Sequence, residues 1–198
     1  MGYSSAMHEA KHPEIWLIRH GETDWSKSGQ HTSRTDLPLT TEGEKRAATL
    51  GSVLKPHSFG LVLASPMRRA QDTARLAGMS PVIEEGLREW DYGKYEGLTS
   101  HEIHKDVPGW TIWNGAVPGG ETGDQVAARA DKVLERAVAA HTDVALFAHG
   151  HILRVVAARW LGMPAEAGKY FALSTATMSI LGYEHDQRVL KVWNDSPH

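Results

Sequence analysis

The chain has 198 residues and a formal net charge of −3, which suits one well-filled core and is short for two domains. It has no cysteine, which excludes disulfides and thiolate metal sites. No basic stripe indicates nucleic acid or an anionic membrane as a partner, and no apolar run is long enough to span a membrane. We therefore expect a cytoplasmic protein with a single domain over residues 14–198, preceded by a flexible tail over residues 1–13.

Apolar runs and amphipathic stretches alternate along the chain, which predicts alternating strands and helices. The expected strands cover residues 14–19, 60–64, 81–83, 143–148, 175–183 and 188–192. The expected helices cover about residues 41–55, 65–77, 99–105 and 122–140, and the stretch that follows His151 and ends at Trp160. Residues 24–38, 84–97 and 107–120 are expected to be loops. This order predicts an α/β fold of three layers, α/β/α, with a mainly parallel central sheet.

Capping residues indicate where three of these helices begin. Thr41 and Thr122 each stand three residues before a glutamate or glutamine, which is the spacing of a capping box. Ser65 followed by Pro66 predicts an N-cap and the first residue of a helix.

Polar side chains follow three of the expected strands at the point where each strand ends. Arg19 and His20 follow the first strand, the stretch from Ser65 to Arg69 follows the second, and His149 follows the fourth. Because ligands of such sheets bind beyond the carboxyl ends of the strands, we expect these side chains to converge. Arginines suit a dianionic group such as phosphate, and a histidine among them can accept a phosphoryl group at nitrogen.

Phosphoryl transfer also requires a proton for the departing alkoxide. The loop over residues 84–97 offers five carboxylates, and chemistry alone does not choose among Glu84, Glu85, Glu89, Asp91 and Glu96. A metal-dependent hydrolase is the alternative that the pair His149 and His151 leaves open, although no carboxylate cluster adjoins them in the sequence. Motifs of P-loop nucleotide-binding proteins, serine hydrolases and zinc proteases are absent.

Six motifs occur in the order in which one protein family carries them. The first reads Leu17-Ile18-Arg19-His20-Gly21-Glu22-Thr23, and the others lie at residues 36–43, 65–74, 87–97, 119–122 and 147–154. This set resembles the histidine phosphatase superfamily in its phosphoglycerate mutase-like branch, over about residues 14–183. Residues 25–32 and 88–97 are most similar to members of the sedoheptulose-bisphosphatase and acid-phosphatase kind.

The resemblance implies a role for individual residues. For catalysis it implies that His20 is the nucleophile that becomes phosphohistidine. Arg19, Arg69 and His149 would bind the phosphoryl group, and Glu89 would be the proton donor. Arg69 is preferred to Arg68 because it directly precedes the alanine of the motif, and Arg68 is expected to be solvated. The expected substrate-binding residues are Thr23, Ser26, Gly150, Trp90 and Tyr92. No metal ligand and no cofactor are expected.

The segment between Gly97 and Gly120 is shorter than its counterpart in cofactor-dependent mutases, which leaves the site more open to water. We therefore expect a metal-independent phosphomonoester hydrolase that acts through phosphohistidine on small phosphorylated metabolites such as sugar phosphates. One alternative is a cofactor-dependent phosphoglycerate mutase. Another is a non-catalytic phosphate-binding regulator, which the complete set of catalytic residues opposes. The expected partner is a small phosphorylated metabolite, with neither nucleic acid nor membrane, and a second copy of the chain is a candidate partner.

Overall fold

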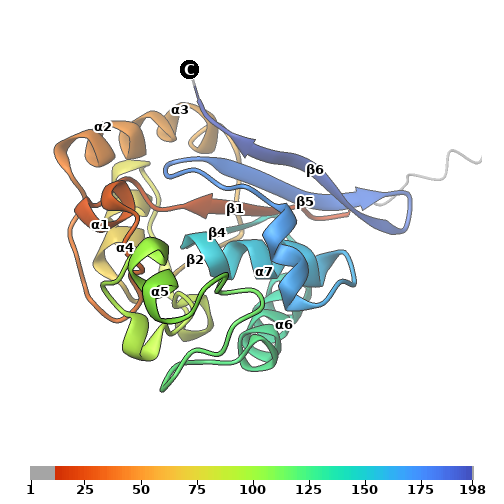
Figure 1. Cartoon of the computed structure of the whole chain (residues 1–198). Coiled ribbons are helices and arrows are strands. Elements are labelled where there is room, and N and C mark those ends of the chain that lie inside the picture. The colour runs from red at the N-terminus through yellow and green to blue at the C-terminus, as the bar shows by residue number, and fades with distance from the viewer. Residues whose placement is uncertain (1–11, 198) are drawn as a thin grey trace, which may run out of the picture.

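A computed structural model describes residues 12–197 and places their six strands in one sheet, in the order β3-β2-β4-β1-β5-β6 (Figure 1). The strands are β1 (Ile15–Arg19), β2 (Leu61–Ala64), β3 (Val82–Ile83), β4 (Val144–Ala148), β5 (Met178–Glu184) and β6 (Gln187–Asp195). The first four pair in parallel, whereas β5 is antiparallel to β1 and β6 is antiparallel to β5. The prediction of a mainly parallel sheet is therefore confirmed.

Helices cover both faces of this sheet (Figure 1). They are α1 (Asp24–Ser28), α2 (Thr41–Thr49), α3 (Gly51–Leu54), α4 (Arg68–Leu76), α5 (Ser100–Asp106), α6 (Gly123–Ala139) and α7 (Gly150–Trp160). Three 3₁₀ turns, η1 (Glu85–Leu87), η2 (Gly93–Tyr95) and η3 (Ala165–Tyr170), lie in the connections. None of the described helices is long and apolar enough to cross a membrane.

The residues of β1 alternate between two hydrophobic clusters. Ile15 and Leu17 pack in the cluster that includes α6 and α7, whereas Trp16 and Ile18 pack in the cluster that includes α3 and α4. Successive side chains of a strand point to opposite faces, so each face of the sheet is covered by its own helical layer. All five residues of β4 are buried, as expected for a strand covered on both sides. These contacts confirm the three layers.

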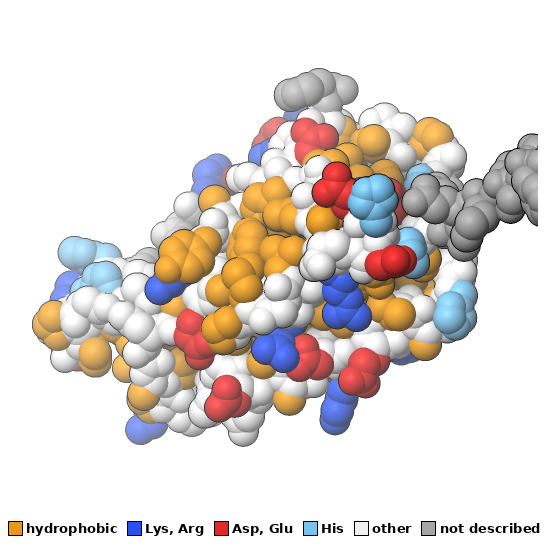
Figure 2. Space-filling view, turned by 90° about the vertical axis from the view of Figure 1, so that its right-hand side faces the viewer, with side chains coloured by type: hydrophobic (Ala, Val, Ile, Leu, Met, Phe, Trp, Pro, Cys, Tyr) orange, Lys and Arg blue, Asp and Glu red, His pale blue; other side chains and the backbone are white. Residues whose placement is uncertain are grey.

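Hairpin β5–β6 projects from one side of the molecule. Figure 2 shows this side, where hydrophobic side chains gather in the middle and charged side chains lie around them. Strand β6 is longer than predicted, because it extends from Gln187 at the turn to Asp195, whereas β5 begins at Met178 and is shorter than predicted.

Helix α2 begins at Thr41, as predicted, but the capping residue differs from the prediction. The cap is Thr40, whose side chain accepts a hydrogen bond from Gly43 N at 3.0 Å. Helix α4 begins at Arg68 and not at Ser65, because the Ser65 hydroxyl is held by His149. The predicted cap of α6 is confirmed, with a complete capping box at Thr122.

Two other expectations need correction. The predicted helix over residues 41–55 is divided into α2 and α3 at Leu50, where the backbone bonds tighten but the chain stays helical. The polar loop predicted over residues 24–38 begins with the short helix α1, which Thr23 and Ser26 cap reciprocally. Most of the tail predicted over residues 1–13 lies outside the described residues.

Candidate active site

The carboxyl ends of β1, β4 and β2 lie side by side and carry the predicted polar residues. His20 N donates a hydrogen bond to the carbonyl of Ala148 at 3.0 Å, and Ser65 N donates to the carbonyl of Phe147 at 2.9 Å. These bonds align the residues that follow the three strands, so that the rings of His20 and His149 face each other with centroids 5.1 Å apart. The structure therefore brings together the side chains that the sequence placed at three separate strand ends.

The His20 imidazole is held in one tautomer. Its Nδ1 lies 2.7 Å from the carbonyl oxygen of Gly21, and a carbonyl can only accept, so Nδ1 carries the proton. Its Nε2 is therefore left with a free lone pair. Burial and the positive charges of Arg69 and Arg19 hold the pKa of His20 well below its usual range, so the ring is neutral at pH 7. A neutral imidazole with a free Nε2 is a competent nucleophile.

Gly21 lets the nucleophile loop pack against α2. A Cβ at this position would lie 2.5 Å from the carbonyl oxygen of Gly43, which no side chain can tolerate. The Gly21 N–H donates to Thr73 Oγ1 of α4 at 2.9 Å. The loop that carries His20 is thus fixed between two helices, which orients the ring.

His149 has the opposite tautomer. Arg69 Nε donates to His149 Nδ1 at 3.1 Å, and an arginine can only donate, so Nδ1 is unprotonated. His149 Nε2 then carries the proton and donates to Ser65 Oγ at 2.7 Å. Burial, followed by the charge of Arg69, holds the pKa of His149 well below its usual range.

Arg69 is fully buried on the first turn of α4. Its guanidinium donates to backbone carbonyls of the segment after α1, at Thr32, Ser33 and Thr35. These contacts fix the cation without neutralising it, because carbonyls carry only partial charges. Arg68 instead points outward and pairs with Asp72 one helical turn later, in line with its expected solvated position.

Arg19 has an unused donor directed into the protein. Among the described residues, its Nε is the one buried side-chain nitrogen or oxygen without a hydrogen-bond partner. One terminal nitrogen donates to the carbonyl of Leu173. A Cβ on Gly150 would lie 3.3 Å from Arg19 Cζ, so the glycine lets α7 begin against the guanidinium. A buried N–H without a partner is costly, and an oxygen of a bound anion would satisfy it.

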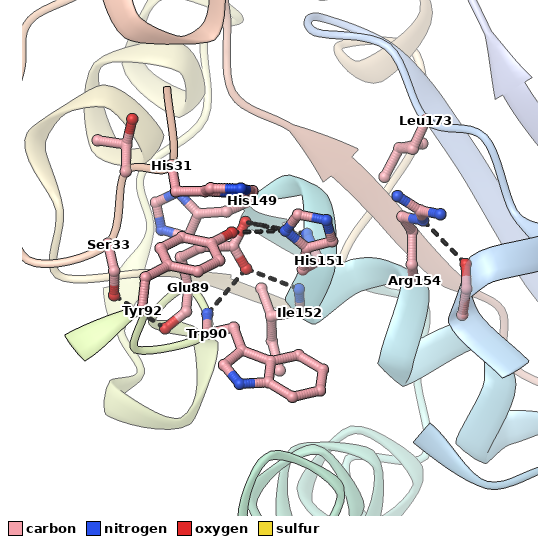
Figure 3. Close-up of polar contacts among 12 residues, drawn as sticks. His31, Ser33, Glu89, Trp90, Tyr92, His149, His151, Ile152, Arg154 and Leu173 are labelled. Carbon is pink, nitrogen blue, oxygen red and sulfur yellow. Dashed lines mark hydrogen bonds and ion pairs between the residues drawn. The ribbon is translucent and has the colours of Figure 1, made fainter. Parts of the chain in front are cut away.

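The Glu89 carboxylate is bound by three backbone N–H groups (Figure 3). Oε1 accepts from Trp90 N at 2.9 Å and from Ile152 N at 2.8 Å, and Oε2 accepts from His151 N at 2.9 Å. Two of these donors belong to the first turn of α7, whose positive end favours a carboxylate. The three bonds fix the orientation of the Glu89 side chain.

The other carboxylates of the acid loop are engaged elsewhere. Glu84 pairs with Arg136, Glu85 with Arg88, Asp91 with Arg34, and Glu96 accepts from the backbone of Ser33 and Thr35. Glu89 is the member of this group that lines the cavity of His20. The geometry thus selects Glu89 as the candidate proton donor from the five carboxylates that chemistry alone left open.

A cavity of about 280 Å³ opens above His20. Thr23, Ser26 and Tyr92 line it, although the Thr23 and Ser26 hydroxyls also form the capping box of α1. Gly150 lies behind it against Arg19. The Trp90 indole points away, donates to the carbonyl of Glu121 at 2.9 Å and lines a different cavity.

His31 and His151 also line the cavity. The sequence assigned no role to His31 and considered His151 with His149 as a possible metal pair. The Tyr92 hydroxyl lies 2.5 Å from His151 Nδ1, and the His31 ring is tilted over Tyr92 with centroids 4.7 Å apart (Figure 3). Burial lowers the pKa of His31 and lowers that of His151 strongly, so both rings are neutral. The position of His151, two residues after His149, could have indicated that it belongs to the site. His31 lies in a segment without periodicity, where the sequence gives no such indication.

The sequence left open a metal centre that His149 and His151 would share. In the structure, these two rings bind different partners. His149 is held by Arg69 and Ser65, whereas His151 meets Tyr92. A separate group of Glu14, His57 and Asp143 has ligand atoms within 4.8 Å of one another. Glu14 and Asp143 directly precede β1 and β4, so this group lies at the amino ends of the strands, opposite the site. Lys191 Nζ lies 2.7 Å from Glu14 there and opposes a bound cation.

The site combines two neutral imidazoles, two arginines and one carboxyl group at the carboxyl ends of the strands. This combination defines a site for phosphate monoesters. The model of the histidine phosphatase superfamily, branch 1, matches residues 15–196. The chain therefore belongs to this superfamily, as the six motifs predicted.

Some known proteins of similar sequence carry phosphatase names, and others are named probable phosphoglycerate mutases at 26–28% identity. An acid phosphatase of Mycobacterium tuberculosis is 41% identical over 189 residues, which cover 93% of each chain. A sedoheptulose 1,7-bisphosphatase of Saccharomyces cerevisiae is 36% identical over 186 residues, covering 76% of this chain and 68% of that protein. A solved structure of a Mycobacterium tuberculosis open reading frame superposes with a TM-score of 0.90 at 40% identity, covering 94% of this chain and 99% of the other.

Proposed function

We propose that this protein hydrolyses phosphomonoesters of small metabolites, such as sugar phosphates, through a phosphohistidine at His20 and without a metal ion. The observation that carries the proposal is the free Nε2 of His20 beside the unpartnered Nε of Arg19. Family membership and the phosphatase names of similar proteins support the reaction class.

In the first step, the Nε2 lone pair of His20 forms a bond to phosphorus while the bond from phosphorus to the ester oxygen breaks. Arg19, Arg69 and the Nε2–H of His149 stabilise the charge on the transferring phosphoryl group. The Gly21 carbonyl accepts from Nδ1–H and stabilises the positive charge that develops on the ring. The departing alkoxide takes a proton from the carboxyl group of Glu89.

In the second step, water attacks phosphorus and the bond to His20 Nε2 breaks. Glu89, now a carboxylate, accepts the proton of this water, and inorganic phosphate leaves. His20 returns to its neutral tautomer, so the cycle needs no redox partner. A phosphoglycerate mutase would instead return the phosphoryl group to a second alcohol.

A screen for phosphate release over a panel of phosphorylated metabolites tests the proposal. A control reaction contains 3-phosphoglycerate and a bisphosphoglycerate primer. We expect phosphate release to be faster than formation of 2-phosphoglycerate; the opposite order would identify a mutase. Binding of phosphate esters without any turnover would identify a phosphate-binding regulator.

Location and assembly belong to the same proposal. We expect the protein to act in the cytoplasm and regard a second copy of the chain as a candidate partner. The hydrophobic side chains that gather on the hairpin side of the molecule are where that copy would bind (Figure 2). Cell fractionation and light scattering of the purified protein test these two expectations.

A further inference from the structure

Arg19 and Arg69 are the two cations that the proposed reaction assigns to one phosphoryl group. Arg69 Nε is bound to His149, and the unpartnered Arg19 Nε lies against the first residue of α7. Neither arginine lines the open cavity above His20. Both cations are therefore used at the position of the phosphorus atom that His20 attacks.

The wall above His20 carries no positive charge. Among the described residues that line the cavity, none is lysine or arginine, and Glu89 is the only carboxylic acid. His31 and His151 do not add charge, because burial lowers the pKa of each ring. The wall otherwise presents aromatic faces and uncharged polar side chains, including Trp25, Gln30 and Ser100.

Basic side chains near this wall are engaged with other groups. Arg154 donates from Nε to the carbonyl of Gly168 at 2.9 Å, and its guanidinium lies 4.5 Å from the centroid of Trp113. Trp113 in turn packs against His151 with centroids 5.1 Å apart. Arg34 is paired with Asp91.

From this distribution of charge we infer that the substrates are monophosphates of uncharged, hydroxyl-bearing alcohols, and that bisphosphates and phosphorylated carboxylic acids are poor substrates. A second anionic group would lose water beside a wall without a positive counter-charge, which is costly. Hydroxyl groups would find uncharged polar partners and aromatic faces there. The inference rests on the proposed function and specifies its substrate class.

Matched substrate pairs test the inference. Fructose 6-phosphate is compared with fructose 1,6-bisphosphate, and glycerol 3-phosphate with 3-phosphoglycerate. We expect kcat/KM to favour the first member of each pair by about tenfold or more. Equal or higher kcat/KM for the second members would overturn the inference while leaving the phosphatase reaction intact.

A second test adds the missing charge. Ser100 is exposed at the start of α5 and lines the cavity, with its hydroxyl 3.3 Å from His31 Nε2. Ser100→Lys should reduce the preference for the monophosphate by about tenfold, and high salt should reverse this change. Ser52→Lys, an exposed position on α3, adds the same charge away from the site and should leave the preference unchanged. An equal shift in both variants, or none in Ser100→Lys, would contradict the inference.

Binding provides a readout that does not need turnover. Calorimetry with His20→Ala compares fructose 6-phosphate with fructose 1,6-bisphosphate in a protein that cannot form phosphohistidine. Tighter binding of the monophosphate is expected, and tighter binding of the bisphosphate would overturn the inference. If no ester is turned over, the proposed function fails, and this binding comparison still decides the selectivity of the cavity.

Discussion

Arg69 donates from Nε to Nδ1 of His149 at 3.1 Å, and this one bond sets the tautomer of the second histidine. It directs the His149 proton to Nε2, which donates to Ser65 Oγ, on the ring that packs edge-on against His20. A bound phosphoryl oxygen can accept the same proton. Arg69 therefore acts twice, as a cation for the phosphoryl group and as the residue that positions His149.

Arg69→Lys should lower kcat/KM by about 10²-fold, although the charge is retained. An ammonium group cannot bind His149 and the carbonyls of residues 32–35 in the same fixed geometry. The matched control is Arg68→Lys, at the exposed neighbour, which should keep the wild-type rate. Equal rates for the two variants would show that only the charge of Arg69 matters. Steady-state kinetics with one sugar monophosphate measures both.

Glu89→Gln should slow a sugar phosphate by about 10²-fold or more and slow p-nitrophenyl phosphate much less. A sugar alkoxide is a strong base that departs badly without a proton, whereas p-nitrophenolate departs unaided. Glu85→Gln, in the same loop but paired with Arg88, is the control and should change neither rate. Equal losses on both substrates would assign Glu89 a binding or structural role.

Stability should fall when the pH drops below about 6.5, the ordinary pKa of histidine. The pKa values of the buried His20, His149 and His151 are lowered well below 6.5 in the folded protein. Below that pH the unfolded chain binds more protons than the folded one, so the free energy of unfolding decreases as pH falls. Each such histidine contributes a slope of up to about 1.4 kcal/mol per pH unit.

Urea unfolding at pH 7.5, 6.5 and 5.5 measures this effect. Most of the loss is expected between pH 6.5 and 5.5, and little between 7.5 and 6.5. Replacing His101, which is exposed on α5, with glutamine should leave the slope unchanged. A free energy of unfolding that is constant from pH 7.5 to 5.5 would show that the buried rings are not held neutral.

Dialysis against EDTA should leave the rate unchanged, because the phosphoryl charge is met by Arg19 and Arg69 instead of a cation. Vanadate should inhibit as a mimic of the transferring phosphoryl group. His57→Ala serves as a control at the remote group of Glu14, His57 and Asp143, and it should not alter turnover. A rate lost on dialysis and restored only by a divalent ion would favour a metallohydrolase.

The parts of the site that lie at strand ends were predictable from sequence. The apolar runs that form β1 and β4 end in Arg19-His20 and His149, and the geometry of a parallel sheet brings such ends together. Local patterns also located α6 and its cap at Thr122. These features depend on short-range preferences and on a topology that alternating elements already imply.

Other parts depend on contacts between distant segments, and periodicity does not report them. Glu89 is selected by backbone N–H groups of His151 and Ile152, more than sixty positions along the chain. Arg69 is held by carbonyls of residues 32–35, in a segment that the sequence showed only as a polar loop. The start of α4 at Arg68 differs from prediction because the Ser65 hydroxyl bonds to His149.

The most direct test of the account is to find the phosphoryl group on His20. The protein is mixed with a phosphorylated substrate, quenched in base within one turnover, and analysed by mass spectrometry of its peptides. We expect an acid-labile, base-stable phosphoryl group on His20, absent from His20→Ala and retained in a control variant at the exposed His101. A phosphoryl group on another residue, or activity above about one per cent of wild type in His20→Ala, would contradict the central claim, since losing the covalent route should cost several kcal/mol.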